Sequence, residues 1–326
     1  MQDFWREQGG KLLQAGALLL SPSSIFSLPE LAVSLAIALA FLAWRQKRRR
    51  GRVRPGVIWR ATMRAAGRLH FGSVRADMFY FFVNSFAISG LIGWALVSSN
   101  AITVHVAHGF AVLFGKRHAA ALPAWALRGA LTLLTFLAYE FAYYCDHYAK
   151  HKIPFLWAFH QTHHSAESLT PLTVFRVHPV DTLIFLNIIA LLTGLAYGGF
   201  FWAAGQEMNP YAIGAANVLT VLFLFLLAQL QHSQFWIPLR GVAGRLVLSP
   251  AHHQLHHSLD PAHHDCNLGS CLAVFDWVFG TLYIPPEAPP RLAFGVTQPA
   301  AEPHRIFTLL LSPFGNALSA LRGRRL

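Results

Sequence analysis

The sequence predicts an all-α integral membrane protein, with about four to five transmembrane helices and a cytoplasmic helical cap that carries clustered histidines. Hydrophobic residues make up 54% of the 326 residues and charged residues only 12%, about half of the charged share of an ordinary soluble domain. Five apolar segments of roughly 20 residues each match the thickness of a bilayer core. Thirteen of the eighteen histidines fall within residues 147–264, which indicates a site built from imidazole groups.

The first predicted span covers residues 25–44 and is followed by a basic segment. Eleven of the 26 lysines and arginines lie in residues 45–75. By the positive-inside rule such a segment stays in the cytoplasm, so we expect the first residue of the chain on the outer side. The formal net charge of +12 is therefore attributed to lipid head groups and membrane topology, and nucleic acid is excluded as a partner.

Further spans are expected to cross the membrane in alternating directions, and they cover residues 78–97, 122–144, 182–203 and 211–230. Residues 100–118 would form an outer excursion, and its three histidines are interpreted as structural or interfacial. Residues 307–321 are apolar enough for a helix that lies on the membrane or packs on the cap. With this topology, every clustered histidine lies on the cytoplasmic side.

Three regions follow from this order. Residues 1–118 form an N-terminal membrane region with the basic cytoplasmic loop 45–75, residues 119–285 form the histidine-bearing domain, and residues 286–326 form a C-terminal tail in the cytoplasm or on the membrane surface. The three cysteines indicate no disulfide framework.

The histidine spacing predicts a metal site. His147 and His151 are four residues apart, and two further sets repeat an i, i+3, i+4 pattern, so on helices each set shares one face. The two further sets are His160, His163 and His164, and His253, His256 and His257. Neutral imidazoles that converge in a buried place need a partner for their lone pairs, and a transition metal supplies one. The alternative, that each ring is solvated or separately hydrogen-bonded, fits a lone histidine better than eight in this pattern.

The boxes HxxxH, HxxHH and a distant HxxHH, with RVHP between them and DCNLG and FDWVFGTL after them, resemble the fatty acid hydroxylase and sterol desaturase superfamily of integral-membrane di-iron enzymes. The resemblance covers roughly residues 140–283. It implies ten metal ligands, which are His147, His151, His160, His163, His164, His178, His232, His253, His256 and His257.

Residues near the boxes are expected to hold the ligand rings by their second nitrogen. The candidates are Glu140, Asp146, His252, His264, Asp265 and Asn267, and the acids Glu167, Asp181 and Asp276 are weighed equally as supports or as solvated surface. Leu268 stands where the family pattern has an aromatic residue.

The resemblance implies a membrane-bound non-haem di-iron monooxygenase of the hydroxylase type, with two iron ions and O2 as co-substrate. Its substrate would be a lipid, a sterol-like molecule or another hydrophobic compound. The sequence has no GxGxxG fingerprint, so electrons would come from an external donor such as a ferredoxin or cytochrome. Phe155, Trp157 and Phe159 are either cavity walls or interfacial anchors. The composition favours a bacterial inner membrane, with the active site facing the cytoplasm.

Other functions stay open at this point. A desaturase of the same family would use the same ligands. A membrane metal-binding or transport protein would favour ionisable groups within its spans, yet residues 182–203 and 211–230 contain no Asp, Glu, Lys, Arg or His. A haem carrier would favour isolated histidines within spans, and a non-catalytic scaffold would favour degenerate boxes.

Overall fold

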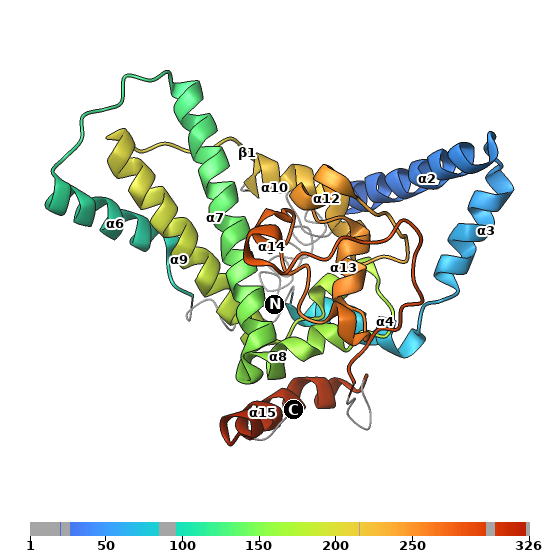
Figure 1. Ribbon diagram of the computed structural model, residues 1–326. Helices are drawn as coiled ribbons and strands as arrows, with labels where there is room; N and C mark the ends of the chain where they lie inside the picture. Colours follow the sequence, from blue (N-terminus) through green and yellow to red (C-terminus); the bar gives the residue numbers. More distant parts are fainter. Residues whose placement is uncertain (1–19, 21–26, 85–95, 215, 298–303, 324–326) are drawn as a thin grey trace, which may run out of the picture.

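The computed structural model describes residues 20, 27–84, 96–214, 216–297 and 304–323 (Figure 1). Helices dominate these residues, as the sequence predicts, and the sheet formed among them is a hairpin of β1 (Ala212–Ile213) and β2 (Ala216–Asn217). Within these described ranges, two helices are long and apolar enough to cross a membrane, α2 (Leu28–Arg50) and α9 (Pro179–Ala204). They correspond to the predicted spans at residues 25–44 and 182–203.

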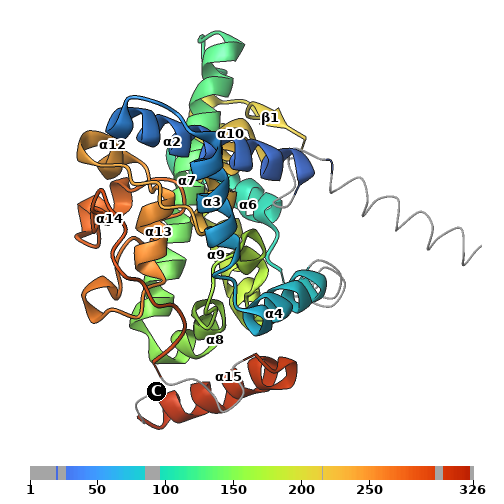
Figure 2. The same cartoon turned by 90° about the vertical axis from the view of Figure 1, so that its right-hand side faces the viewer.

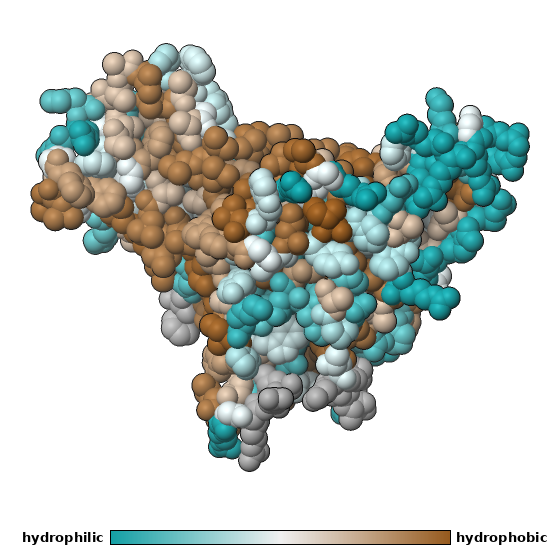
Figure 3. All heavy atoms as spheres, in the orientation of Figure 1, coloured by the Kyte–Doolittle hydropathy of each residue, from teal (hydrophilic) through white to brown (hydrophobic). Residues whose placement is uncertain are grey.

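The ends of α2 follow from local sequence. The side chain of Ser27 accepts a hydrogen bond from the backbone N–H of Glu30, which satisfies one of the free donors at the start of the helix. Four basic residues in the last turn complement the negative end of the helix dipole, and Gly51 follows in a left-handed conformation. Figure 3 shows hydrophilic atoms over this end of α2 and over the neighbouring α3 (Pro55–Ala66). It shows hydrophobic atoms over α6 (Ser99–Phe114), α7 (Ala124–Lys152) and α9.

The expected outer excursion is instead largely helical. Helix α6 (Ser99–Phe114) packs along α9, and glycines on α9 allow the close approach. A Cβ at Gly194 would lie 2.8 Å from Cβ of Ile102, and a Cβ at Gly198 would lie 2.7 Å from Cβ of Val106. Two small residues four positions apart are typical of tightly packed helices in membranes.

The predicted span at residues 211–230 is interrupted. Its first part forms the hairpin, and a shorter apolar helical segment follows as α10 (Val218–Phe223), a π-helical turn η4 (Leu224–Ala228) and α11 (Gln229–Gln231). Asn217 explains the break, because its side chain accepts from the N–H of Leu219 and donates to the carbonyl oxygen of Thr132. The predicted span at residues 78–97 begins in α4 (Phe71–Phe82), and residues 85–95 lie outside the described part.

Helix α7 (Ala124–Lys152) is the central element of the fold. It is longer than the predicted span at residues 122–144 and packs against both α9 and α8 (Pro154–His164). Pro154 occupies the first turn of α8, where a missing N–H costs nothing. The turn at Ile153 therefore places the second histidine box directly after the first.

The third box lies in a compact group of short elements beside α7. These are α12 (Gly241–Leu246), α13 (Pro250–His256), η5 (Pro261–His263) and α14 (Val274–Phe279). The 3-10 turn η3 (Pro171–Phe175) links α8 to α9. The last helix, α15 (Ile306–Leu321), matches the predicted helix at residues 307–321 and packs against α8, below which it lies in both ribbon views (Figures 1 and 2).

Candidate metal centre

Nine largely buried histidines gather in two groups where α7, α8 and α13 meet. Each ring offers one nitrogen, and within a group these nitrogens all lie within 4.8 Å of one another. The five-histidine group contains His147, His151, His160, His164 and His256. The four-histidine group contains His163, His232, His253 and His257.

Helical geometry divides the second box between the two groups. His160 and His164 are one turn apart on α8 and join the five-histidine group, whereas His163 points about 100° away from His164 and joins the four-histidine group. The third box divides in the opposite way. His253 and His257 belong to the four-histidine group, and His256 belongs to the five-histidine group.

The buried ring nitrogens of the five-histidine group indicate a metal site. Among the described residues, Nε2 of each of its five rings is buried without a hydrogen-bond partner. A buried lone pair without a partner is costly, and five that face one place indicate a cation between them. Imidazole nitrogens suit several first-row metals, iron included, so the donor set fits the expected metal.

Backbone carbonyls hold two of these rings. Nδ1 of His147 lies 2.7 Å from the carbonyl oxygen of Leu268, and Nδ1 of His256 lies 2.9 Å from that of Cys266. A carbonyl only accepts, so Nδ1 carries the proton and Nε2 keeps its lone pair for a metal. Asp265 and Asn267 both have left-handed backbone conformations, with φ of 58° and 56°, which shape the loop that presents the two carbonyls.

Carboxylates hold two further rings. Nδ1 of His160 donates to Oδ2 of Asp181 over 2.8 Å, and Nδ1 of His151 donates to Oδ1 of Asp265 over 3.2 Å. A carboxylate at the far nitrogen fixes the ring and makes it a stronger metal ligand. Asp265 and Asp181 therefore stand where the sequence predicted supporting acids.

The four-histidine group brings its Nε2 atoms face to face. Nε2 of His232 lies 3.3 Å from Nε2 of His163 and 2.9 Å from Nε2 of His253. Nε2 of His253 in turn lies 3.2 Å from Nε2 of His257. A neutral ring has a single N–H, so these contacts cannot satisfy all four nitrogens well. A cation among four lone pairs would satisfy them together.

Burial keeps these rings neutral. Desolvation lowers the pKa of His232 to about 3. It also lowers the pKa of His163, His164, His253 and His257 well below the ordinary imidazole value, and neighbouring histidines add to the effect. Because a metal ligand must be unprotonated, the groups are prepared for binding at neutral pH.

A buried ion-pair chain stands behind His160. Nζ of Lys150 lies 2.5 Å from Oδ2 of Asp146 and also contacts Oδ1 of Asp181, and all three side chains are almost fully buried. Asp146, predicted as a direct support of a ring, thus acts through Lys150 and Asp181. Lys150 was not predicted from the sequence, although its i, i+4 spacing from Asp146 was a usable signal.

His178 is not brought to either group. Its Nδ1 accepts from the N–H of Val180 at the start of α9, and its Nε2 lies 3.1 Å from the carbonyl oxygen of Leu310. Both nitrogens are thus engaged with backbone, and the residue caps α9. His178 thus lies outside both groups, where the family resemblance implied a ligand.

The remaining predicted supports hold loops and not rings. Oε2 of Glu140 accepts from the N–H groups of Cys271 and Leu272, each over 2.8 Å. Asp276 accepts from the N–H groups of Leu268 and Gly269 and so fixes the loop behind His147.

Asn267 forms hydrogen bonds with the backbone of His252 and Tyr283, and it thereby ties the third box to the segment after α14. His252 is fully buried, and its Nδ1 contacts Ser249 at the start of α13. His264 is exposed and does not touch a ligand ring through any contact in the described part of the chain.

A cavity of about 790 Å³ opens beside both groups. Its walls include His151, His164, His256 and His257, and Trp157 lines it as one of the predicted aromatic walls. Phe155 and Phe159 instead pack between α8 and α15. The other wall residues are Pro154, Gln161, Ser258, Leu259, His264, Asp265, Gly295, Val296, Thr297, Asn316, Ser319, Ala320 and Gly323.

Comparisons with known proteins agree with the histidine pattern. Residues 132–281 match the family model described as fatty acid hydroxylase. Alkylglycerol monooxygenase of Xenopus tropicalis is 27% identical over 171 residues, which are 51% of this chain and 33% of that protein. The enzyme of the same name from Danio rerio is 28% identical over 174 residues, which are 51% of this chain and 33% of that protein. The one from Homo sapiens is 27% identical over 169 residues, which are 50% of this chain and 32% of that protein. No solved structure gives a significant match.

Proposed function

Because the chain belongs to the fatty acid hydroxylase and sterol desaturase superfamily, we propose that it is a membrane-bound non-haem di-iron monooxygenase that hydroxylates a lipid. The observation that carries the proposal is the pair of histidine groups, with five unpartnered Nε2 atoms in one and four facing Nε2 atoms in the other. Two groups of histidine ligands agree in number with the two iron ions of the proposed centre. The match spans about a third of the length of the named relatives, so activity, substrate and partners are all part of the proposal.

The nine histidines would hold two iron ions, one in each group. Bound iron would activate O2, so that one oxygen atom is inserted into a C–H bond while two electrons from the external donor and two protons reduce the other atom to water. The protein's own part is to keep the rings neutral by burial and to fix their direction through carbonyls and carboxylates. An imidazole set also leaves the metal charge largely uncompensated, unlike the carboxylate-rich sites of soluble di-iron bundles.

The cavity supports a lipid with a polar head group. Its volume of about 790 Å³ lies within the usual range for small-molecule sites. Polar side chains such as Gln161 and Asn316 share its walls with Trp157, so it offers both hydrogen bonds and apolar contact. We propose an alkylglycerol-type ether lipid as the first substrate to test, because the relatives are named alkylglycerol monooxygenase. An external electron donor and a cytoplasmic orientation of the site belong to the same proposal.

Metal analysis of single-site variants tests the centre. We expect the wild-type chain, expressed with iron and purified in mild detergent, to carry two irons. The His256→Ala variant should lose iron from the five-histidine group and His253→Ala from the four-histidine group, while the exposed His108→Ala should keep both. Zinc or no metal in the wild type would contradict the proposal.

Isotope labelling tests the reaction. Membranes containing the wild-type or the His256→Ala chain would be supplied with an alkylglycerol, reductant and 18O2, and the lipids analysed by mass spectrometry. We expect one 18O atom in a product that only the wild type forms. A product with two hydrogens fewer and no label would identify a desaturase, and identical lipids in both samples would contradict oxygenation.

A further inference from the structure

Helix α15 has two different flanks beside its buried face. Leu309 and Ala317 are buried, the first against Ala76 and Tyr80 of α4 and the second against α8. One flank carries five large apolar side chains spaced four, three, four and three residues apart, which are Phe307, Leu311, Phe314, Leu318 and Leu321. Their side chains are 49% to 69% exposed. A stripe of this kind is unusual on a surface that faces water.

The other flank of α15 is small or polar and faces the cavity. Asn316, Ser319, Ala320 and Gly323 line the cavity that also contains ligand rings of both groups. The helix thus separates the metal centre from whatever covers its apolar flank.

The apolar flank lies on the side of α15 where the candidate span α9 begins. The ring of Phe314 lies 5.3 Å from that of His178, the N-cap of α9, measured between centroids. Val180, in the first turn of α9, packs against the cluster that contains Ala317. Figure 1 shows α15 lying across the lower end of α7 instead of running along it. These contacts place the helix at the level where α9 would enter the membrane.

Charge at the end of α15 suits an anionic surface. Arg322 follows the helix and is exposed, and the sequence adds Arg324 and Arg325 with no acidic residue after Glu302. Each arginine near an anionic leaflet contributes about 1 kcal/mol to membrane attraction. An amphipathic helix with basic residues at its end is typical of interfacial membrane helices.

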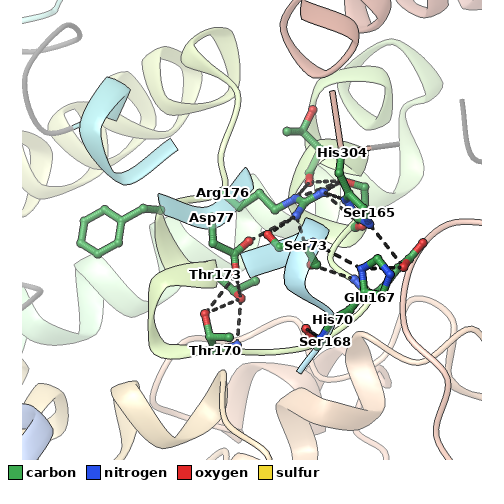
Figure 4. Close-up of polar contacts among 12 residues, drawn as sticks. His70, Ser73, Asp77, Ser165, Glu167, Ser168, Thr170, Thr173, Arg176 and His304 are labelled. Carbon is green, nitrogen blue, oxygen red and sulfur yellow. Dashed lines mark hydrogen bonds and ion pairs between the residues drawn. The ribbon is translucent and has the colours of Figure 1, made fainter. Parts of the chain in front are cut away.

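A buried polar network fixes the start of α15 (Figure 4). Arg176 is fully buried, pairs with Asp77 over 3.2 Å, and donates from Nη2 to Nδ1 of His304 over 3.1 Å. Since arginine only donates, Nδ1 of His304 accepts, and its Nε2 lies 3.3 Å from Oε2 of Glu167. His70 approaches the same oxygen, also at 3.3 Å. The tautomer leaves no lone pair on Nε2 of His304, so this trio is a structural latch and not a third metal site.

We propose that α15 is an interfacial helix that lies in the membrane surface with its apolar flank among the lipid chains, and that it forms the wall between the bilayer and the metal cavity. The latch ties His304, just before the first turn of α15, to Glu167 in the loop after the second box, while the apolar flank of α15 rests on lipid. A substrate lipid would then reach the cavity beside this helix. The placement of α15 goes beyond the proposed reaction and holds whether or not the centre hydroxylates lipid.

Lipid quenching of single labels tests this placement. Leu311→Cys and Leu318→Cys would carry a nitrobenzoxadiazole label on the apolar flank, and Ser312→Cys would carry it on the other flank as a matched control. The parent chain, labelled in parallel, measures the background from Cys145, Cys266 and Cys271. The full chain would be placed in nanodiscs that contain phosphatidylglycerol and lipids brominated in the acyl chain. Both exposed leucine positions tolerate the change without loss of packing.

We expect brominated lipid to quench the labels at positions 311 and 318 at least several-fold more than the label at position 312. Equal quenching at all three positions would overturn the proposal. So would labels at 311 and 318 that are quenched by aqueous iodide, which would show a flank in water. Labels shielded from both quenchers would mean that a protein, either a partner or a second copy, covers the flank, and would also overturn it. None of these readouts depends on catalysis, so failure here is separate from failure of the proposed reaction.

Discussion

The carboxylate of Asp181 accepts a hydrogen bond from Nδ1 of His160 over 2.8 Å, and Lys150 contacts its other oxygen. One buried cation thus neutralises a carboxylate that orients a predicted metal ligand. The arrangement joins the start of α9 to the second histidine box on α8. Single substitutions can measure two effects separately here: the effect of the Asp181 charge on metal affinity, and the effect of the buried Lys150 on stability.

The Asp181→Asn variant should keep the fold and lose metal affinity. An amide can still accept from Nδ1 of His160, but it lacks the charge that strengthens the ring as a ligand, so we expect iron affinity to fall by about 10- to 100-fold. Chelator competition measures this. The exposed Glu207→Gln is the matched control and should behave as wild type. Unchanged affinity in Asp181→Asn would show that the contact does not tune the site.

The Lys150→Met variant should instead lose stability. It leaves Asp146 and Asp181 buried without their common cation, and breaking a buried pair in this way costs about 3–5 kcal/mol. Thermal unfolding in detergent would show a lower midpoint than wild type. The double variant Lys150→Met with Asp146→Asn should recover part of the loss. A midpoint equal to wild type in the single variant would contradict the buried pairing.

The His178→Ala variant distinguishes a cap from a ligand. Because His178 caps α9 with its Nδ1, we expect both irons to remain and the free energy of unfolding to fall by about 0.5–2 kcal/mol. Iron content and thermal unfolding measure the two effects on the same sample. Loss of one iron would restore the interpretation as a ligand that the family resemblance implied.

Because α6 packs closely on α9, a single added methyl group on α9 should lower the unfolding midpoint. In Gly198→Ala, the new Cβ would lie 2.7 Å from Cβ of Val106, so the helices must separate and we expect a lower unfolding midpoint. Gly129→Ala on α7 is the matched control, because no atom of the described chain lies within 4 Å of its new Cβ. This control should gain about 0.5–1 kcal/mol, since alanine favours helix over glycine. Equal midpoints would contradict the packing.

Stability should fall as the pH drops below the ordinary imidazole pKa. His232, with a pKa of about 3, and His163, with a pKa well below the usual value, stay neutral in the folded state while the unfolded chain takes up protons near pH 6.5. The unfolded state then binds more protons, so acid destabilises the fold and higher pH leaves it unchanged. For each such histidine, we expect the free energy of unfolding to fall by about 1.4 kcal/mol for every pH unit below about pH 6.5. Thermal unfolding of metal-free protein from about pH 8 to about pH 5 measures this, and a flat profile would contradict it.

The sequence by itself predicted that the chain is helical and apolar and which histidines would meet. Of its five predicted spans, two correspond to helices of the described residues that are long and apolar enough to cross a membrane. Nine of the ten predicted ligands come together. For eight of them, i, i+3 and i+4 spacing fixes their directions on a helix before any tertiary contact exists, whereas His232 was implied only by the family resemblance. The backbone capping by His178 could not be seen in this way, since it depends on where Val180 and Leu310 lie.

Only the tertiary structure decided how the rings divide into five and four. That division depends on how α7, α8 and α13 face one another, and it also relies on carbonyls of Cys266 and Leu268, which every residue possesses and no sequence pattern marks. The role of Lys150 likewise required the start of α9 to approach α7. Local spacing fixes directions along one helix, whereas distances between helices come from packing that involves the whole chain.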